Sequence, residues 1–228
     1  MARSRWISDL HWVRTGRQTR SQKTQESLLE AAAVLVSEKG AENASVADVA
    51  ARAGCSVGSV YHHFRDKKAL LYALFDRMSE ELRATTRAAA DPARWEGASV
   101  ADVLRGFLEF SLEIGRDRPT FKRAGLEASR GDPVLRERMA ELHAELDEAL
   151  RGLVLARRGE IGHPDPGLAT GFVLDQLGSM LRTRLEEISI PTQLASQPDE
   201  VFVREALRSV CAYLRVQSPA GGEAPETS

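Results

Sequence analysis

Apolar residues recur at helical spacing along most of this 228-residue chain. Between residues 22 and 39 they stand three and four positions apart, the spacing of one buried helix face. These positions are Leu28, Leu29, Ala32, Leu35 and Val36. Gly40 follows, where helices often end on a left-handed residue. The pattern predicts a first helix over about 22–39.

The next apolar group, between 45 and 64, predicts two short helices joined by a tight turn. Ser45 and Asp48 stand three residues apart ahead of the first helix, as in a capping box. Gly54 falls where the chain must reverse, and glycine alone adopts a left-handed conformation without steric cost. Ser56 can cap the second helix. Its predicted apolar anchors are Val57, Val60, Tyr61 and Phe64. This is the layout of a helix-turn-helix.

Longer helices follow. Asp66 is a natural N-cap for one reaching about Thr86, with an apolar face of Leu70, Leu71, Leu74, Phe75 and Met78. Pro and Gly then divide the remainder into helices at about 98–116, 119–129, 133–158, 165–188 and 199–216. The predicted fold class is all-α, with about nine helices. An N-terminal three-helix helix-turn-helix domain is joined to a larger helical domain.

Composition indicates the cellular location of the chain and the state of its cysteines. It has no apolar run of about 18 residues and no signal-peptide core, so no membrane contact and a cytoplasmic location are expected. Cys55 and Cys211 stand far apart and in no metal-ligand spacing. Both are predicted to be reduced packing residues.

Charge divides the chain into two parts. Residues 1–68 hold 11 Lys/Arg and 7 Asp/Glu, a net +4, while the remainder holds 20 and 26, a net −6. A basic N-terminal part on an acidic remainder suits a DNA-binding domain on a body that stays off the phosphates. The predicted domains are a basic, flexible arm (1–20), a DNA-binding domain (21–68), a helical body (69–217) and a disordered tail (218–228).

The arm allows two interpretations. The arm contains several basic residues and a single acidic one, Asp9. In one interpretation the arm follows the DNA backbone or enters the minor groove, as N-terminal arms of DNA-binding domains do. In the other it is a disordered tail. Its apolar cluster is unusual for a solvated tail and can pack as a short helix. Otherwise, the native start lies downstream of Met1. The basic residues are Arg3, Arg5, Arg14, Arg17, Arg20 and Lys23, and the apolar ones Trp6, Ile7, Leu10, Trp12 and Val13.

The stretch from 45 to 71 resembles the TetR family of bacterial transcription regulators. The matching positions are Ser45, Val49, Ala50, Ala53, Gly54, Ser56, Gly58, Val60, Tyr61, His63, Phe64, Lys67 and Leu70. Cys55 stands where the family usually has Val, which keeps a small apolar side chain in the turn. The resemblance is specific over about residues 24–78. Beyond them it rests on length and helix pattern.

The resemblance implies double-stranded DNA as a partner. The phosphate contacts that it implies are Ser45, Tyr61, His62 and Lys67, and the residues facing base edges are Ser56, Val57, Gly58 and Ser59. His63, beside them, completes the predicted DNA-binding set. Gly58 would let the helix approach the groove, and the Ser59 hydroxyl can donate to or accept from a base.

The resemblance also implies a homodimer and a small-molecule effector. The helices at about 165–188 and 199–216 are apolar on more than one side, and their copies would form a four-helix bundle on a palindromic operator. Candidate effector contacts are aromatic, sulfur or polar side chains of the body. They are Phe107, Phe110, Phe121, Met139, His143, Phe172, Gln176 and Met180.

Other chemistry finds little support. The chain holds no catalytic or nucleotide-binding motif, and no enzyme activity or cofactor is predicted. His62 and His63 are adjacent, so on a helix they point about 100° apart, and no metal site is predicted. The function predicted is a ligand-responsive regulator, a repressor released from its operator by an effector. The alternatives are an enzyme or carrier with a similar helical corner, and an activator without effector.

Overall fold

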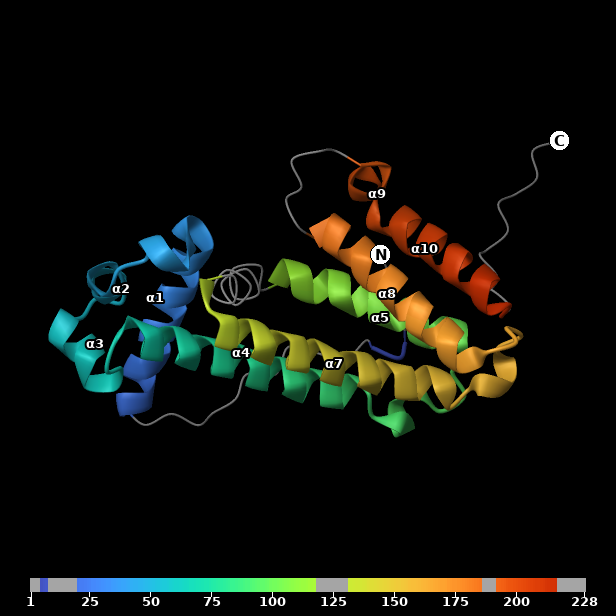
Figure 1. Ribbon diagram of the computed structural model, residues 1–228, viewed down its shortest axis with the longest axis horizontal. Helices are drawn as coiled ribbons and strands as arrows, with labels where there is room; N and C mark the ends of the chain where they lie inside the picture. The colour runs from blue at the N-terminus through green and yellow to red at the C-terminus, as the bar shows by residue number, and fades with distance from the viewer. Residues whose placement is uncertain (1–4, 8–19, 118–130, 186–191, 217–228) are drawn as a thin grey trace. The chain divides into compact units, whose positions relative to one another are not determined.

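The computed structural model describes residues 5–7, 20–117, 131–185 and 192–216 (Figure 1). Over these ranges the regular structure is helical and contains no strand, which confirms the all-α prediction. The helices are α1 (Arg20–Asn43), α2 (Val46–Arg52), α3 (Val57–His63), α4 (Lys67–Ala89), α5 (Val100–Asp117), α7 (Pro133–Leu155), α8 (Pro166–Leu185), α9 (Gln193–Ser196) and α10 (Asp199–Leu214), with 3₁₀ turns at Pro92–Trp95 and Arg158–Glu160.

The predicted helix boundaries hold closely. Gly40 interrupts α1 with a φ of 84°, at the position predicted for the helix end. The one-turn helix α9 and the two 3₁₀ turns were not predicted. The predicted helix at 119–129 and the tail at 218–228 lie outside the described residues. None of the described helices is long and apolar enough to cross a membrane.

The chain forms two compact units. The head unit comprises residues 11–86 and 116–146, and the body unit comprises residues 1–10, 87–115 and 147–228. Helices α4 and α7 each contribute residues to both units. The domain boundaries predicted from the sequence stay predictions.

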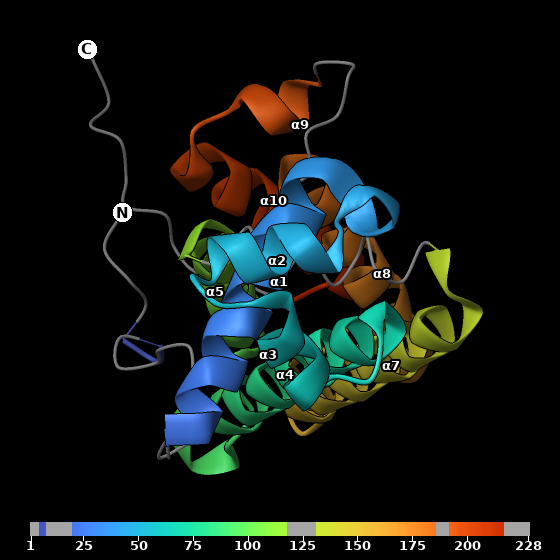
Figure 2. The same ribbon diagram turned by 90° about the vertical axis from the view of Figure 1, so that its left-hand side faces the viewer.

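The head unit is built on the first four helices. Figure 2 shows α2 and α3 beside α1. Helix α1 contacts α2, and α2 contacts α3. The predicted apolar stripe of α1 is buried from Leu28 to Val36, and α4 adds Leu70, Leu74, Phe75 and Met78 to the same core. Val49 and Ala50 of α2 and Val60 of α3 close it. This packing holds the two short helices, which have little stability alone.

A buried charge network lies beside that core. The Arg77 side chain on α4, 10% exposed, forms ion pairs with Glu26 of α1 and with Glu81 one turn along α4. The Arg77 Nε atom lies 3.1 Å from Glu81 Oε1, and the Glu81 side chain is fully buried. A charge buried in this way depends on its partners for compensation.

The body unit packs α5, α8 and α10 around a second core. Figure 1 shows α8 and α10 side by side, and the two helices contact each other. The buried apolar residues of this core include Leu104 and Leu108 of α5, Val173 and Leu177 of α8, and Leu207 and Val210 of α10. The wide apolar surface that the sequence predicted for α8 and α10 is therefore largely core.

A short N-terminal segment belongs to the body core. Ile7 is buried there, and the Trp6 ring stacks on Trp95 with centroids 6.2 Å apart. The Arg94 guanidinium donates to the Trp6 carbonyl oxygen at 3.0 Å. Gly106 leaves the space for Trp95, because a Cβ there would lie 2.5 Å from the indole. Residues 1–4 and 8–19 of the predicted arm, including Leu10, Trp12 and Val13, lie outside the described residues, and Arg20 begins α1.

The two cysteines differ in exposure, which predicts different reactivity. Cys211 is buried, and burial raises the pKa of its thiol to about 11, whereas Cys55 is half-buried. Because the thiolate is the nucleophile, we expect a disulfide reagent at neutral pH to modify Cys55 in the folded protein and Cys211 only after unfolding. Thiol titration of wild type and of Cys55→Ser measures this, and a fast phase in Cys55→Ser would contradict it.

Candidate DNA interface

The start of α2 has the capping box predicted from the sequence. The Ser45 hydroxyl accepts from the Asp48 N–H at 3.1 Å, and the Asp48 carboxylate accepts from the Ser45 N–H at 3.1 Å. The Lys39 ammonium lies 2.7 Å from the same carboxylate. Lys39 and then the Ser45 hydroxyl hold the pKa of Asp48 far below its usual range. The cap therefore stays charged and fixes where α2 begins.

The turn between α2 and α3 depends on Gly54. Its φ of 69° lies in the left-handed region, where a side chain is strained. The Cys55 N–H donates to the Ala50 carbonyl at 3.0 Å, which closes the turn. Ser56 then caps α3 by accepting from the Ser59 N–H at 3.1 Å. Both predictions, the glycine turn and the serine cap, are confirmed.

The anchors predicted for α3 are half right. Val60 and Phe64 are buried, but Val57 and Tyr61 are exposed, Tyr61 by 54%. Val60 and Tyr61 are consecutive and point about 100° apart. A seven-residue helix that packs along one edge can bury only one of them. The outer edge of α3 thus presents an apolar and an aromatic side chain to solvent.

The remaining residues of the predicted DNA-binding set lie on or next to this edge. Ser45, Ser56, Gly58 and His62 are exposed, and Ser59, His63 and Lys67 are half-buried. A Cβ on Gly58 would meet only the Ser56 hydroxyl, at 3.7 Å. The protein itself therefore does not require glycine at this position. The role of each residue in DNA binding stays a prediction.

The two histidines at the end of α3 contact each other edge to face. Their ring centroids are 5.3 Å apart with planes at 81°. Among the described residues, no three histidine, cysteine or acidic side chains are grouped so that they could hold a metal ion. Aromatic contact, rather than ligation, is the interaction seen between His62 and His63.

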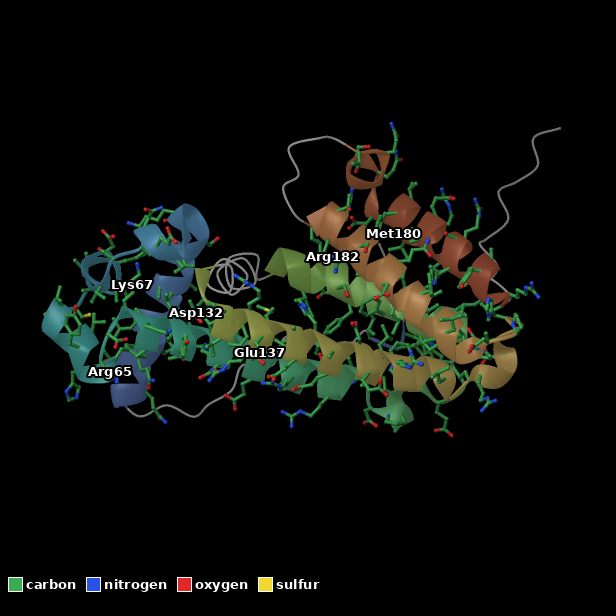
Figure 3. All side chains as sticks on the ribbon, in the orientation of Figure 1. Arg65, Lys67, Asp132, Glu137, Met180 and Arg182 are labelled. Atoms are coloured by element: carbon green, nitrogen blue, oxygen red, sulfur yellow. The ribbon has the colours of Figure 1, made fainter. Side chains whose placement is uncertain are left out.

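Two basic residues follow α3 closely in the chain, Arg65 and Lys67, and Figure 3 labels both. Arg65 follows the helix, and its side chain is 89% exposed although it pairs with Asp66 at 3.0 Å. The Lys67 ammonium donates to the Glu42 carbonyl at 2.7 Å. An ammonium has three donors, so this bond leaves two for a phosphate. Arg52 pairs with Glu38 on the α1 side.

Three residues that meet around the start of α4 were not singled out from the sequence. Lys68 and Tyr72 on α4 both contact Asp132, which precedes α7. A sequence signal existed for Asp132, since an acidic N-cap followed by Pro is a helix-start pattern. The contacts to α4 carry no local signal, because the partners stand 60 or more residues apart.

The predicted effector residues are spread over the structure. Phe107, Phe110 and Met180 pack against the body core, and Met139 packs against the head core. Phe172 is 61% exposed, His143 is exposed, and the Gln176 amide donates to Ser209 Oγ at 3.1 Å. Phe121 lies outside the described residues. The set as an effector site stays a prediction.

The body unit contains a groove of about 810 Å³. Trp95 and Gly97 line one side, and Glu148, Gly152 and Leu153 of α7 line the other. None of the predicted effector residues lines it. Arg157 holds this region together by donating to the carbonyls of Trp95, Ala98 and Leu153.

Comparison with known proteins agrees with this geometry. The family model described as "Bacterial regulatory proteins, tetR family" matches residues 28–74, which run from α1 through the helix-turn-helix into α4. The chain is 30% identical to the HTH-type transcriptional repressor AcnR of Corynebacterium glutamicum over 166 residues, 72% of this chain and 78% of AcnR.

Two further proteins extend the comparison. The chain is 33% identical to the HTH-type transcriptional regulator CymR of Pseudomonas putida over 118 residues, 52% of this chain and 57% of CymR. The match to CymR therefore spans little more than half of that relative. The crystal structure of the TetR family regulator PfmR from Thermus thermophilus matches with a TM-score of 0.58 and 26% identity, covering 90% of this chain and all of PfmR.

Proposed function

The chain belongs to the TetR family of bacterial regulatory proteins, and we propose that it is a repressor that binds a palindromic operator as a dimer and leaves it when a small molecule binds. The observation that carries the DNA-binding role is the exposed edge of α3. A short helix held by a serine cap and a glycine turn presents Val57 and Tyr61 outward, with Ser59 half-buried between them and basic side chains at its end. An edge of this size fits the major groove.

The dimer is proposed through α8 and α10. Leu168, Phe172 and Tyr213 are large apolar residues that remain exposed on these helices. Clustered apolar exposure of this kind marks a contact surface. A two-fold dimer would present two copies of α3 to the two halves of a palindrome.

The sign of regulation and the effector are supported by family membership. AcnR is named a repressor. A ligand can bind more tightly to the dimer conformation in which the two head units do not match the operator. It then lowers DNA affinity by the difference between its binding free energies for the two conformations, about 1–3 kcal/mol. The site of action would be the cytoplasm, where the operator is.

A mobility shift with DNA from upstream of the protein's own gene tests this function. We expect a discrete complex that survives competitor DNA and weakens steeply with salt, because phosphate contacts release counterions. Tyr61→Ala and Lys67→Ala should weaken binding to all sequences alike, and Lys67→Ala should lower the salt slope by about 1. Ser59→Ala should change sequence preference.

The control is Glu80→Ala, an exposed residue of α4 in the head unit, which should bind as wild type does. If neither Tyr61→Ala nor Lys67→Ala weakens binding, the interface lies elsewhere on the head. Weak binding that disappears at moderate salt without sequence preference would favour the enzyme or carrier alternative. Release of the complex by small molecules then separates a ligand-responsive repressor from a regulator without effector.

A further inference from the structure

Helices α4 and α7 of the head unit are joined by three charged pairs. Lys68 pairs with Asp132 at 3.0 Å, Asp76 with Arg138 at 3.0 Å, and Arg83 with Glu145 at 2.6 Å. The pairs follow the same direction along both helices, about two turns apart. The sign alternates, so that the base lies on α4, then on α7, then on α4 again.

This alternation specifies one register. If α7 slid by about two turns toward the end of α4, Asp132 would face Asp76 and Arg138 would face Arg83. A slide the other way would bring Arg138 toward Lys68. Both shifts place like charges together, and such repulsion selects against the wrong pairing. The α7 start is therefore held opposite the α4 start.

Asp132 differs from the acidic residues of the other two pairs because groups from both α4 and α7 contact its side chain. Its side chain is only 18% exposed and accepts from the Tyr72 hydroxyl at 3.1 Å. It also accepts from the N–H groups of Val134 at 2.9 Å and Leu135 at 3.3 Å, which caps α7. Lys68 is the main reason that the pKa of Asp132 lies below its usual range. One carboxylate thus ties α7 to the first two turns of α4.

The same turn of α4 is tied to the end of α1, just before the helix-turn-helix begins. Lys67, next to Lys68, donates to the Glu42 carbonyl, three residues before the Ser45 cap of α2. Residues 64–66 alone separate α3 from α4. Figure 3 labels Lys67 at the start of α4 and Asp132 ahead of α7. A displacement of the first turn of α4 would therefore move α3.

We propose that Asp132 is a positioning residue for DNA binding, which holds the first turn of α4, and with it α3, in the arrangement that fits the operator. This inference rests on the proposed function and identifies a residue that supports operator binding without touching DNA. The pair itself adds little stability, since the Lys68 side chain is 62% exposed. Its effect lies in geometry, because Asp132 makes the start of α7 and the start of α4 move together.

The test uses the full-length protein and its operator fragment. Asp132→Asn keeps an oxygen that can cap α7 but removes the charge that holds Lys68. We expect operator affinity to fall about 5- to 20-fold, in the lower part of the range of about 5- to 150-fold that is typical of coupling between sites. Binding to unrelated DNA at low salt should stay unchanged. Lys68→Met should produce the same fall, and the double variant should fall no further, because both changes remove one interaction.

Glu145→Gln is the matched control, since it breaks an exposed pair between the same two helices away from α3. It should leave operator affinity near wild type. Lys68→Met leaves the α7 cap intact and carries the test alone if Asp132→Asn does not fold.

Two results would overturn the proposal. Equal operator affinity for wild type and the variants would leave Asp132 as a helix cap only. Tighter binding by Asp132→Asn, with a steeper salt dependence, would make Lys68 a phosphate contact that Asp132 withholds. The absence of any operator complex with wild type would instead remove the proposed function, and this inference with it.

Discussion

Replacing Arg77 with methionine is expected to destabilise the protein by about 3–5 kcal/mol, the cost of removing one partner from a buried ion pair. The Arg77 guanidinium reaches Glu81 through both Nε and Nη2 and also pairs with Glu26. Methionine fills similar space but supplies no charge. The fully buried Glu81 carboxylate would then lose this compensation in a medium of low dielectric. Urea denaturation followed by circular dichroism measures the loss.

Two variants show whether the buried charge is the cause. The double change Arg77→Met with Glu81→Leu removes both charges, and replacing a buried pair with apolar groups is often neutral. It should recover most of the lost stability. Arg138→Met breaks an exposed pair with Asp76 and should cost about 0–1 kcal/mol. If Arg77→Met costs no more than Arg138→Met, the network with Glu26 and Glu81 contributes no more than a surface pair.

This network shows where sequence-based prediction ends. Arg77 and Glu81 stand four residues apart on a helix, a spacing typical of a solvated surface pair. Their burial depends on α1, whose Glu26 lies 51 residues before Arg77. By contrast, the Ser45 and Ser56 caps and the Gly54 turn were predicted correctly, because each is determined by residues within one turn of the chain. Local chemistry could be predicted, and partners distant in sequence could not.

The same division applies to the candidate interface. To predict the exposed edge of α3, one must know that Val60, rather than Tyr61, faces α1 and α2. The sequence analysis predicted both residues as buried anchors. A helix was predicted to start at 133, but the contacts of Asp132 with Lys68 and Tyr72 were not predicted, because they cross 60 or more residues. The effector residues were chosen by side-chain type alone. Whether these residues form one site stays a prediction.

Replacing Phe172 with glutamate is expected to convert the proposed dimer into a monomer. Phe172 is 61% exposed and its ring lies 6.4 Å from that of Tyr213, with Leu168 one turn away on α8. Near a two-fold axis the same charge would enter the interface from both subunits. Desolvation and repulsion would then both oppose association. Sedimentation velocity over a concentration series measures the change.

The fold of the subunit should survive this change, because an exposed side chain contributes little to the core of its own chain. Thermal unfolding of the monomeric variant, compared at equal concentration, then reports chiefly the loss of association. Val134→Glu is the matched control, since Val134 is another exposed apolar residue, on α7 in the head unit. It should remain dimeric. If Phe172→Glu is dimeric as well, the subunits associate through a surface other than the one around Phe172.

Operator binding should respond more strongly than stability does. A dimer engages two half-sites at once, and linking two binding events raises affinity by about 10²–10⁴ over one. The Phe172→Glu monomer should therefore lose at least about 10²-fold in operator affinity, while its α3 remains intact. It should still shift a single half-site at high concentration, with about half the salt slope, because half of the phosphate contacts remain. A monomer that binds the full operator as tightly as wild type would mean that one head reads the whole site, and the palindrome would have no role.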